Sequence, residues 1–494
     1  MERKEYFAFI IAVIIVFSAI VIFNESRKKT STAKAEKIVI DDYDPTTDIE
    51  LIFRIDRIRK IDFERGENPT VFLEISMNGE SYEVGEWKGI DVYPRWRHIQ
   101  NVDDRNENVT IEVKLYEKME GENLMSDISP RRGDYTGKTM KIIYSLKTGE
   151  WYGDDYLKDS NGYGHCSGTE DGNYDENDYE IWFDVYQTDY DGDRLTWYEE
   201  VFVYGTNPNI SDYGKDYDND GLPIEWEDKY GYNPFVYENH SMLDPDEDGI
   251  QNTEEYLMNE WHSDPFAKDI FVEVDYMANR FFGSTTFPEY SKEKVVSAFT
   301  KHNFTLHVDD GLMGGGGEIL PYEKFYTQEK LSKYYKEYFL HDGENEWRKG
   351  VFRYCVMAHY TIPSKKNVAG YSYWPTNEDV FNCFVIGTRV IKNYRFTPLA
   401  RETAIASLFM HELGHTLGIF WHTFHGCDNS TTIYPWLSGW SIYENYKSCM
   451  NYRYAWQLID YSDGSHGEND FDDWSHIDPA FFEKRFFAEP PIIL

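Results

Sequence analysis

The pattern of hydrophobic and polar positions changes along the chain. Residues 6–23 form an unbroken apolar run between basic residues, long enough to span a bilayer as a helix. From residue 38 to about residue 152, short runs of alternating apolar and polar residues are separated by Gly, Asn and Asp. Such alternation, with many β-branched residues, is typical of strands that bury one face, so we expect an antiparallel β-sandwich here.

After residue 265 the pattern becomes that of a mixed domain. Residues 270–276 and 305–308 predict strands on either side of a helix at residues 291–302, and further strands are expected at residues 352–360 and 383–391. A strand, helix, strand order is typical of α/β domains with parallel pairing. We therefore expect a separate α/β domain at the end of the chain.

A long helix in this last domain carries the strongest chemical signal. Thr397 is a suitable N-cap, and Gly418 can end the helix in the left-handed conformation. His411 and His415 stand four residues apart, so they project from one face of the helix and can share a metal ion. Glu412 lies beside them as a candidate general base.

After this helix the chain continues with H-T-F at residues 422–424 and G-C at residues 426–427, and the whole segment resembles the metzincin zinc proteases, in particular their pappalysin-like branch. Residues 411–425 read H-E-L-G-H-T-L-G-I-F-W-H-T-F-H, against the family pattern H-E-x-x-H-x-x-G-x-x-H. Residues 448–452 read S-C-M-N-Y and match the methionine-containing turn of that family. The third histidine of the pattern would fall on Trp421, and in this chain it comes one residue later, as His422.

The resemblance implies a zinc-dependent endopeptidase and assigns roles to its residues. Glu412 would take a proton from the zinc-bound water as it attacks a peptide carbonyl. Met450 would form an apolar floor under the metal, and Tyr452 could contact the metal or the developing oxyanion. Residues 384–389 would border the cleft and pair with substrate main chain. The expected zinc ligands are His411, His415 and His422, with His425 and Asp428 as the alternatives to His422.

Three acidic loops before this domain repeat at spacings of 27 and 28 residues. Each has the pattern D-x-D-x-D with a glutamate eleven residues after its first aspartate; glycine follows the third aspartate except in the first loop, which has Arg194. Such loops converge carboxylate oxygens on calcium, and they resemble type 3 thrombospondin repeats and dockerin-like loops. Calcium would stiffen them into a spacer. The predicted calcium ligands are Asp189, Asp191, Asp193 and Glu200, then Asp216, Asp218, Asp220 and Glu227, then Asp244, Asp246, Asp248 and Glu255.

The positions of the five cysteines suggest two pairs that could form disulfides. Cys427 and Cys449 both fall near the expected metal site and could form a disulfide there, or alternatively supply a thiolate ligand to the zinc. Cys355 and Cys383 lie on neighbouring predicted strands and could also pair, which would leave Cys166 alone.

Composition narrows the classes of partner. With 49 basic and 88 acidic residues the net charge is −39, so no basic field is present for nucleic acid. An acidic balance suits calcium binding or a high-salt environment. We expect a protein or peptide substrate, and a membrane contact through the N-terminal helix.

Together these observations predict a multidomain fold class. Its parts are a signal anchor and linker (1–37), a β-sandwich whose element order resembles C2-type domains (38–184), a calcium-binding repeat array (185–265) and a metzincin-like α/β (α+β) metalloprotease domain (266–494). The expected location is the cell membrane, as a single-pass protein with its bulk extracytoplasmic, or alternatively secretion after signal cleavage. The alternative function is a calcium-dependent cell-surface adhesion or envelope protein with an inactive protease-like domain.

Overall fold

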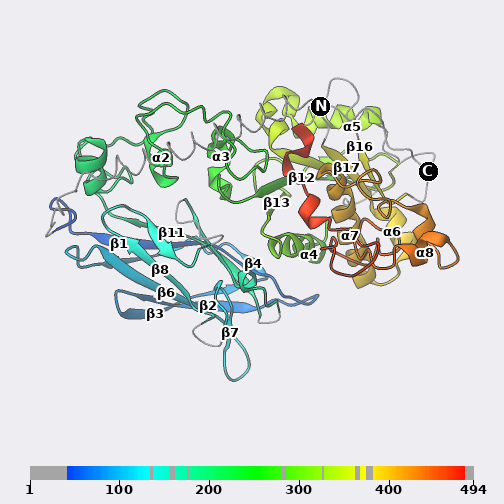
Figure 1. Cartoon of the computed structure of the whole chain (residues 1–494), viewed down its shortest axis with the longest axis horizontal. Coiled ribbons are helices and arrows are strands. Elements are labelled where there is room, and N and C mark those ends of the chain that lie inside the picture. The colour runs from blue at the N-terminus through cyan, green and yellow to red at the C-terminus, as the bar shows by residue number, and fades with distance from the viewer. Residues whose placement is uncertain are drawn as a thin grey trace, which may run out of the picture.

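The computed structural model describes residues 42–133, 137–155, 162–174, 177–280, 285–324, 328–361, 368–373 and 382–483. Figure 1 shows an N-terminal β-rich part in blue and cyan, an intervening segment in green, and a C-terminal domain in green to red. Below, the middle segment is called the acidic array (residues 185–265), and the part after it the C-terminal domain.

Two antiparallel sheets pack face to face in the N-terminal part. One has the strand order β10-β11-β1-β4, with β5 also paired to β1, and the other has the order β3-β2-β6-β8-β9, with β7 paired to β6. Alternate side chains of both sheets, such as Phe53, Ile75 and Ile111, fill the core between them. The strands are β1 (Glu50–Lys60), β2 (Thr70–Met77), β3 (Glu80–Lys88), β4 (Asp91–Val92), β5 (Trp96–Asn101), β6 (Asn108–Glu117), β7 (Leu124–Ser126), β8 (Met140–Ser145), β9 (Trp151–Gly153), β10 (Gly164–Ser167) and β11 (Tyr179–Gln187).

The acidic array consists of loops joined by short helices. These are η3 (Glu199–Tyr204), α2 (Ile224–Lys229), α3 (Asn252–Leu257) and η4 (Asn259–Trp261). The apolar residue two positions after the third aspartate of each loop is buried, namely Leu195, Leu222 and Ile250. Leu222 packs with Trp226 and Tyr230 of α2 and the residue after it, whereas Ile250 belongs to a core that also contains Phe271 of the C-terminal domain.

The C-terminal domain is built on a mostly parallel sheet of order β13-β12-β15-β17-β16, with β14 paired to β12. β16 pairs with β17 in the antiparallel direction and lies at the end of the order. β17 therefore has neighbours on both sides, so the expectation that residues 384–389 border the cleft is corrected: among the described residues, the strand at this edge of the sheet is β16. The strands are β12 (Asp269–Met277), β13 (Thr305–Asp309), β14 (Ile319–Leu320), β15 (Phe352–Ala358), β16 (Gly370–Tyr373) and β17 (Cys383–Gly387).

Helices cover both faces of this sheet. Ile270 and Val272 of β12 face a core shared with α4 and α7, whereas Phe271 faces a second core shared with α5. The helices are α4 (Glu289–Thr300), α5 (Gln328–Tyr334), η5 (Tyr335–Phe339), η6 (His341–Gly343), η7 (Glu346–Gly350), α6 (Thr388–Tyr394), α7 (Pro398–Thr416), η8 (Ser430–Thr432), α8 (Ser438–Ile442), η9 (Trp474–His476) and η10 (Pro479–Glu483). The strand expected at residues 383–391 is thus β17 followed by α6.

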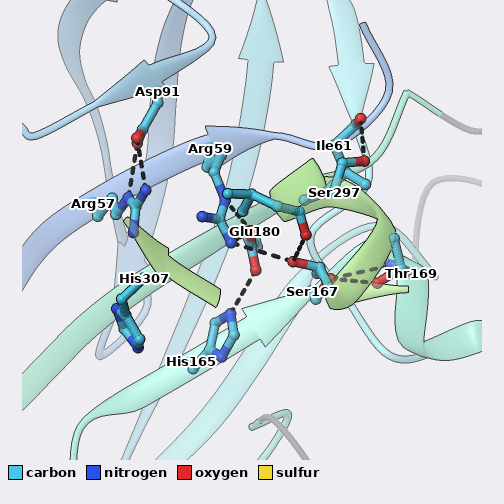
Figure 2. A network of polar contacts seen from close by, with 12 residues as sticks. Arg57, Arg59, Ile61, Asp91, His165, Ser167, Thr169, Glu180, Ser297 and His307 are labelled. Atoms are coloured by element: carbon cyan, nitrogen blue, oxygen red, sulfur yellow. Dashed lines mark hydrogen bonds and ion pairs between the residues drawn. The ribbon is translucent and has the colours of Figure 1, made fainter. Parts of the chain in front are cut away.

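Buried polar contacts attach the β-sandwich to α4 of the C-terminal domain. Arg59 forms an ion pair with Glu180, and its Nη2 donates to Thr300 Oγ1 at 3.2 Å. Glu180 also lies 2.9 Å from His165 Nε2, and Ser297 Oγ donates to the carbonyl oxygen of Ile61 at 2.9 Å (Figure 2). The sandwich is therefore joined to the C-terminal domain directly, in addition to the connection through the acidic array.

The predicted fold class is wrong in combining these domains with a transmembrane helix. In the residues that the structure describes, no helix is both long enough and apolar enough to cross a bilayer. Helix α7 is the longest of the described helices, with 19 residues, but it carries charged side chains and packs within the C-terminal domain. The apolar run at residues 6–23 lies outside the described residues. What the structure describes is a chain rich in β-sheet.

Candidate metal centre

Helix α7 carries His411 and His415 to one buried site. The helix begins as its sequence predicts, because the Thr397 side chain accepts from Ala400 N and proline follows. It ends before Gly418, whose φ of 92° is in the left-handed region, and Ile419 N then bonds to the carbonyl of Gly414 at 3.0 Å.

Hydrogen bonds on the opposite side of each imidazole fix the orientation of the two histidines. His411 Nδ1 lies 2.8 Å from the carbonyl oxygen of Cys449, and His415 Nδ1 lies 2.8 Å from that of Ile419. A carbonyl only accepts, so each Nδ1 carries the proton and donates it. In neutral histidines this leaves both Nε2 lone pairs free to bind a metal, an arrangement that is usual for metal-bound histidine.

The carboxylate of Asp428 completes the group. Its Oδ1 lies 3.1 Å from His411 Nε2, and its Oδ2 lies 3.5 Å from His415 Nε2. The ligand atoms of these three residues all lie within 4.8 Å of one another. The structure thus brings together His411, His415 and one of the alternatives to His422. His422 itself and His425 are exposed, and the latter ring lies against Trp421.

The charges of this group suit a cation. Burial lowers the pKa of His411, but the hydrogen bond and charge of Asp428 outweigh burial and raise it to about 9. Burial raises the pKa of Asp428, whereas the two histidines hold it at about 2. Asp428 therefore presents its negative charge to the Nε2 atoms of both imidazoles. Two imidazoles and one carboxylate are a donor set that zinc takes in peptidases, so the residues fit that metal.

Glu412 lies beneath the edge strand β16. Ser372 Oγ donates to Glu412 Oε2 at 2.6 Å and lies 2.9 Å from the carbonyl oxygen of Glu412. A Cβ at Gly370 would collide with the same carboxylate, which explains the glycine there. Burial raises the pKa of Glu412, and the two histidines and Ser372 oppose that rise. Ser372 has no signal in the sequence, because its strand is only four residues long and lies far from the helix in the chain.

The methionine-containing turn supports the centre from below. Met450 is fully buried, and its Sδ lies so near the helix that a Cβ at Gly414 would meet it at 2.8 Å. Asp428 N donates to the Met450 carbonyl at 3.1 Å, which places the aspartate opposite the histidines. The Tyr452 ring stacks on His411 with centroids 5.7 Å apart.

The cysteine pairings suggested by the sequence are not formed. Cys427 and Cys449 are buried free thiols, and Cys427 Sγ lies 3.7 Å from Asp428 Oδ2 as a weak donor. Burial raises the pKa of both thiols, which disfavours the thiolate needed for disulfide formation or zinc binding. Cys355 and Cys383 cannot pair because Cys355 faces the α4 and α7 core, whereas Cys383 faces the opposite core.

The acidic loops form a second set of candidate metal sites. In each loop the first aspartate accepts backbone N–H groups of its own loop, as Asp216 Oδ2 does from Gly221 N at 3.1 Å and Asp244 Oδ2 does from Gly249 N at 3.0 Å. Buried carboxylate oxygens remain without a hydrogen-bond partner on Asp191, Asp218, Asp246, Glu227 and Glu255. Unpaired buried carboxylates are costly unless a cation neutralises them.

Two loops also gather a side chain that the repeat pattern did not indicate. In the first, Asp212 joins Asp193 and Glu200, and in the second, His240 joins Asp220 and Glu227. Asp212 and His240 come twelve and thirteen residues after the glutamates of their loops. The sequence does not show that the chain folds back there and brings these side chains to the loops.

The comparisons with known proteins assign no family. No protein-family model matches the chain, and no curated protein matches it. Among solved structures, a C2 domain of plant extended synaptotagmin 1 is 12% identical, with 28% of this chain and 93% of that one covered and a TM-score of 0.18. A further C2 domain is 6% identical, with 28% and 97% covered and a TM-score of 0.18. Human GIVD cytosolic phospholipase A2 is 8% identical, with 28% and 16% covered and a TM-score of 0.18. At such TM-scores, these likenesses assign neither a fold nor a function to the chain.

Proposed function

We propose that the C-terminal domain is a zinc-dependent endopeptidase whose metal is held by His411, His415 and Asp428. The observation that carries this proposal is the convergence of two Nδ1-anchored imidazoles on one aspartate, beside the buried carboxylate of Glu412. Zinc bound there would supply Lewis acidity, which polarises a substrate carbonyl and makes water more acidic.

Glu412 is the general base in this proposal. Burial raises its pKa above the ordinary value of a glutamate, which makes the carboxylate a stronger base. The hydrogen bond from Ser372 holds one of its oxygens, so the other can face the attacking water. Glu412 would take the proton of that water and pass it to the leaving amine of the cleaved peptide.

The edge strand and the tyrosine complete the site. β16 pairs with β17 on one side only among the described residues, so its other side can bind the main chain of an extended substrate. Because hydrogen bonds to the main chain do not depend on the substrate's side chains, such binding would tolerate many substrate sequences. Tyr452 lies over His411, and its hydroxyl, which is protonated at neutral pH as in any ordinary tyrosine, can donate to the oxygen that gains charge.

Zinc stoichiometry and cleavage of an unstructured protein substrate test this proposal. We expect about one zinc per chain, with cleavage abolished and zinc retained in Glu412→Gln. Absence of zinc and of cleavage in the unchanged chain would refute the proposal. Zinc binding without any cleavage would instead favour an inactive protease-like domain in a surface protein.

We also propose that the three loops of the acidic array bind calcium through the aspartates and glutamates predicted from the repeat. One support is the set of buried carboxylate oxygens without a hydrogen-bond partner. The other is the crowding of like charges. Burial and the charges of Asp193 and Asp191 raise the pKa of Glu200 to about 8, and burial and the charges of Asp220 and Asp218 raise that of Glu227 to about 8. Calcium is far more abundant outside cells than in the cytoplasm, so we propose that the protein acts outside the cytoplasm, where these loops would be filled. Isothermal titration with calcium tests this, and no heat of binding would refute it.

A further inference from the structure

We propose that the third acidic loop binds its calcium together with Asp269, the first residue of β12, and that this shared ion fixes the C-terminal domain. The inference rests on the proposal that the loops bind calcium. Asp248, Glu255 and Asp269 are 1%, 0% and 2% exposed. An acidic residue from the first strand of the C-terminal domain is thus buried with the carboxylates of the loop.

Direct contacts join Asp269 to this loop. Asp269 N donates to Asp248 Oδ2 at 2.8 Å, and the charge of Asp269 acts on Asp246, Asp248 and Glu255. Asp246 Oδ2 and Glu255 Oε1 are buried without a hydrogen-bond partner. The carboxylate of Asp269 is oriented by two contacts: His307 Nε2 lies 2.7 Å from Oδ1, and Asp264 N donates to Oδ2 at 3.0 Å. Four carboxylates without a cation among them would repel one another strongly, and one calcium ion relieves this.

The first loop repeats the same arrangement within the acidic array. Asp212 N donates to Asp193 Oδ2 at 2.8 Å, just as Asp269 N does to Asp248 Oδ2. The Asp212 carboxylate lies with those of Asp193 and Glu200 as a group that could hold a metal ion. In both loops, the third aspartate of the motif therefore accepts a hydrogen bond from the backbone of a later aspartate. In the third loop, the recruited residue belongs to the C-terminal domain.

Contacts lead from the third loop to the end of the active-site helix. Gly249 lies so close to η10 that a Cβ there would meet Ala480 Cα at 2.9 Å. Arg353 of β15 donates to the carbonyl oxygen of Pro479 at 2.6 Å and to Thr416 Oγ1 at 3.1 Å. Thr416 is the last residue of α7. An ordered third loop thus supports β12 through Asp269 and supports the end of α7 through η10 and Arg353.

Hydrogen exchange of the full chain, with and without calcium and at equal measured zinc content, tests the inference. We expect calcium to slow exchange in β12 and in the last turn of α7. Asp269→Asn should raise the calcium concentration needed for this protection by at least about tenfold, because it removes one charged ligand. Asp212→Asn is the matched control: it should weaken the first site and leave protection of β12 unchanged.

The possible outcomes separate this inference from the proposals before it. Calcium bound by the chain without slower exchange in β12 would overturn the inference alone, as would equal calcium requirements for the unchanged chain and Asp269→Asn. No calcium bound at all would overturn the calcium proposal and the inference with it. Calcium-dependent protection in a chain that binds no zinc would support the inference and refute only the peptidase.

Discussion

His411 Nε2 lies 3.1 Å from Asp428 Oδ1, although twelve residues, with a helix end and a turn among them, separate Asp428 from His415. The other oxygen of the same carboxylate lies 3.5 Å from His415 Nε2. One aspartate therefore faces both imidazoles at once, in the position that a third metal ligand would take.

The first prediction concerns the choice of the third ligand. Asp428→Asn replaces a charged ligand with a weak neutral one, and we expect zinc affinity to fall at least about a hundredfold. His422→Ala and His425→Ala remove exposed imidazoles and should retain zinc. Competition with a chromogenic chelator measures all three affinities. If His422→Ala loses zinc and Asp428→Asn retains it, the third ligand is His422, as the sequence predicts, and the assignment to Asp428 is wrong.

The second prediction concerns the orientation of Glu412. Ser372→Ala removes the 2.6 Å hydrogen bond to Oε2, so we expect kcat to fall about tenfold with unchanged zinc content. Because that hydrogen bond lowers the pKa of Glu412, its loss should also move the acid limb of the pH–rate profile to higher pH. The exposed Ser441→Ala is the control. An unmoved acid limb would show that Ser372 does not act through Glu412.

The metal centre shows how much of the candidate site could be predicted from the sequence. The spacing of His411, Glu412 and His415 is set by one helix, so a local pattern was sufficient to bring them together. Asp428 is placed by its own φ of 52° and by its bond to the Met450 carbonyl, and neither is visible in the sequence.

The same limit applies to pairing between distant segments. Alternation predicted the sandwich strands and the spacing of apolar residues predicted β12, α4 and β13, but the position of β16 at the edge depends on the order in which the strands pair. Asp212 and Asp269 likewise return to loops about twenty residues earlier through backbone contacts that leave no local signal.

The third prediction concerns pH and calcium. Without calcium, Glu200 and Glu227 have a pKa of about 8 in the folded chain against an ordinary value of 4.5. The folded state then binds these protons more tightly than the unfolded state does, so this contribution to stability is fully present below pH 4.5 and is lost as the pH rises through 8. Bound calcium stabilises the ionised forms and should remove the loss.

Melting temperatures measured on both sides of that range, with and without calcium, test this prediction. The difference made by calcium should grow as the pH rises. Glu200→Gln should reduce the calcium-free loss, because its side chain does not ionise. Identical pH dependence in the two conditions would contradict the assignment of these glutamates to cation sites.

The fourth prediction concerns the junction between the sandwich and α4. Arg59 and Glu180 are 1% and 0% exposed and form an ion pair (Figure 2). Glu180→Gln leaves the guanidinium buried without its counter-ion, so we expect the free energy of unfolding to fall by about 3–5 kcal/mol in urea denaturation. Asp103→Asn, which breaks the exposed pair with Arg105, should cost at most about 1 kcal/mol. Equal small losses in both variants would show that the buried pair adds little.

Anomalous diffraction at the zinc absorption edge, from crystals of the zinc-loaded chain, tests the central claim most directly. We expect a single strong peak about 2.0–2.2 Å from His411 Nε2, His415 Nε2 and one oxygen of Asp428, with Glu412 beside the open side of the metal. A peak bound by His422 or His425 in place of Asp428 would contradict the ligand set. The absence of any zinc between His411 and His415 would contradict the metal centre itself.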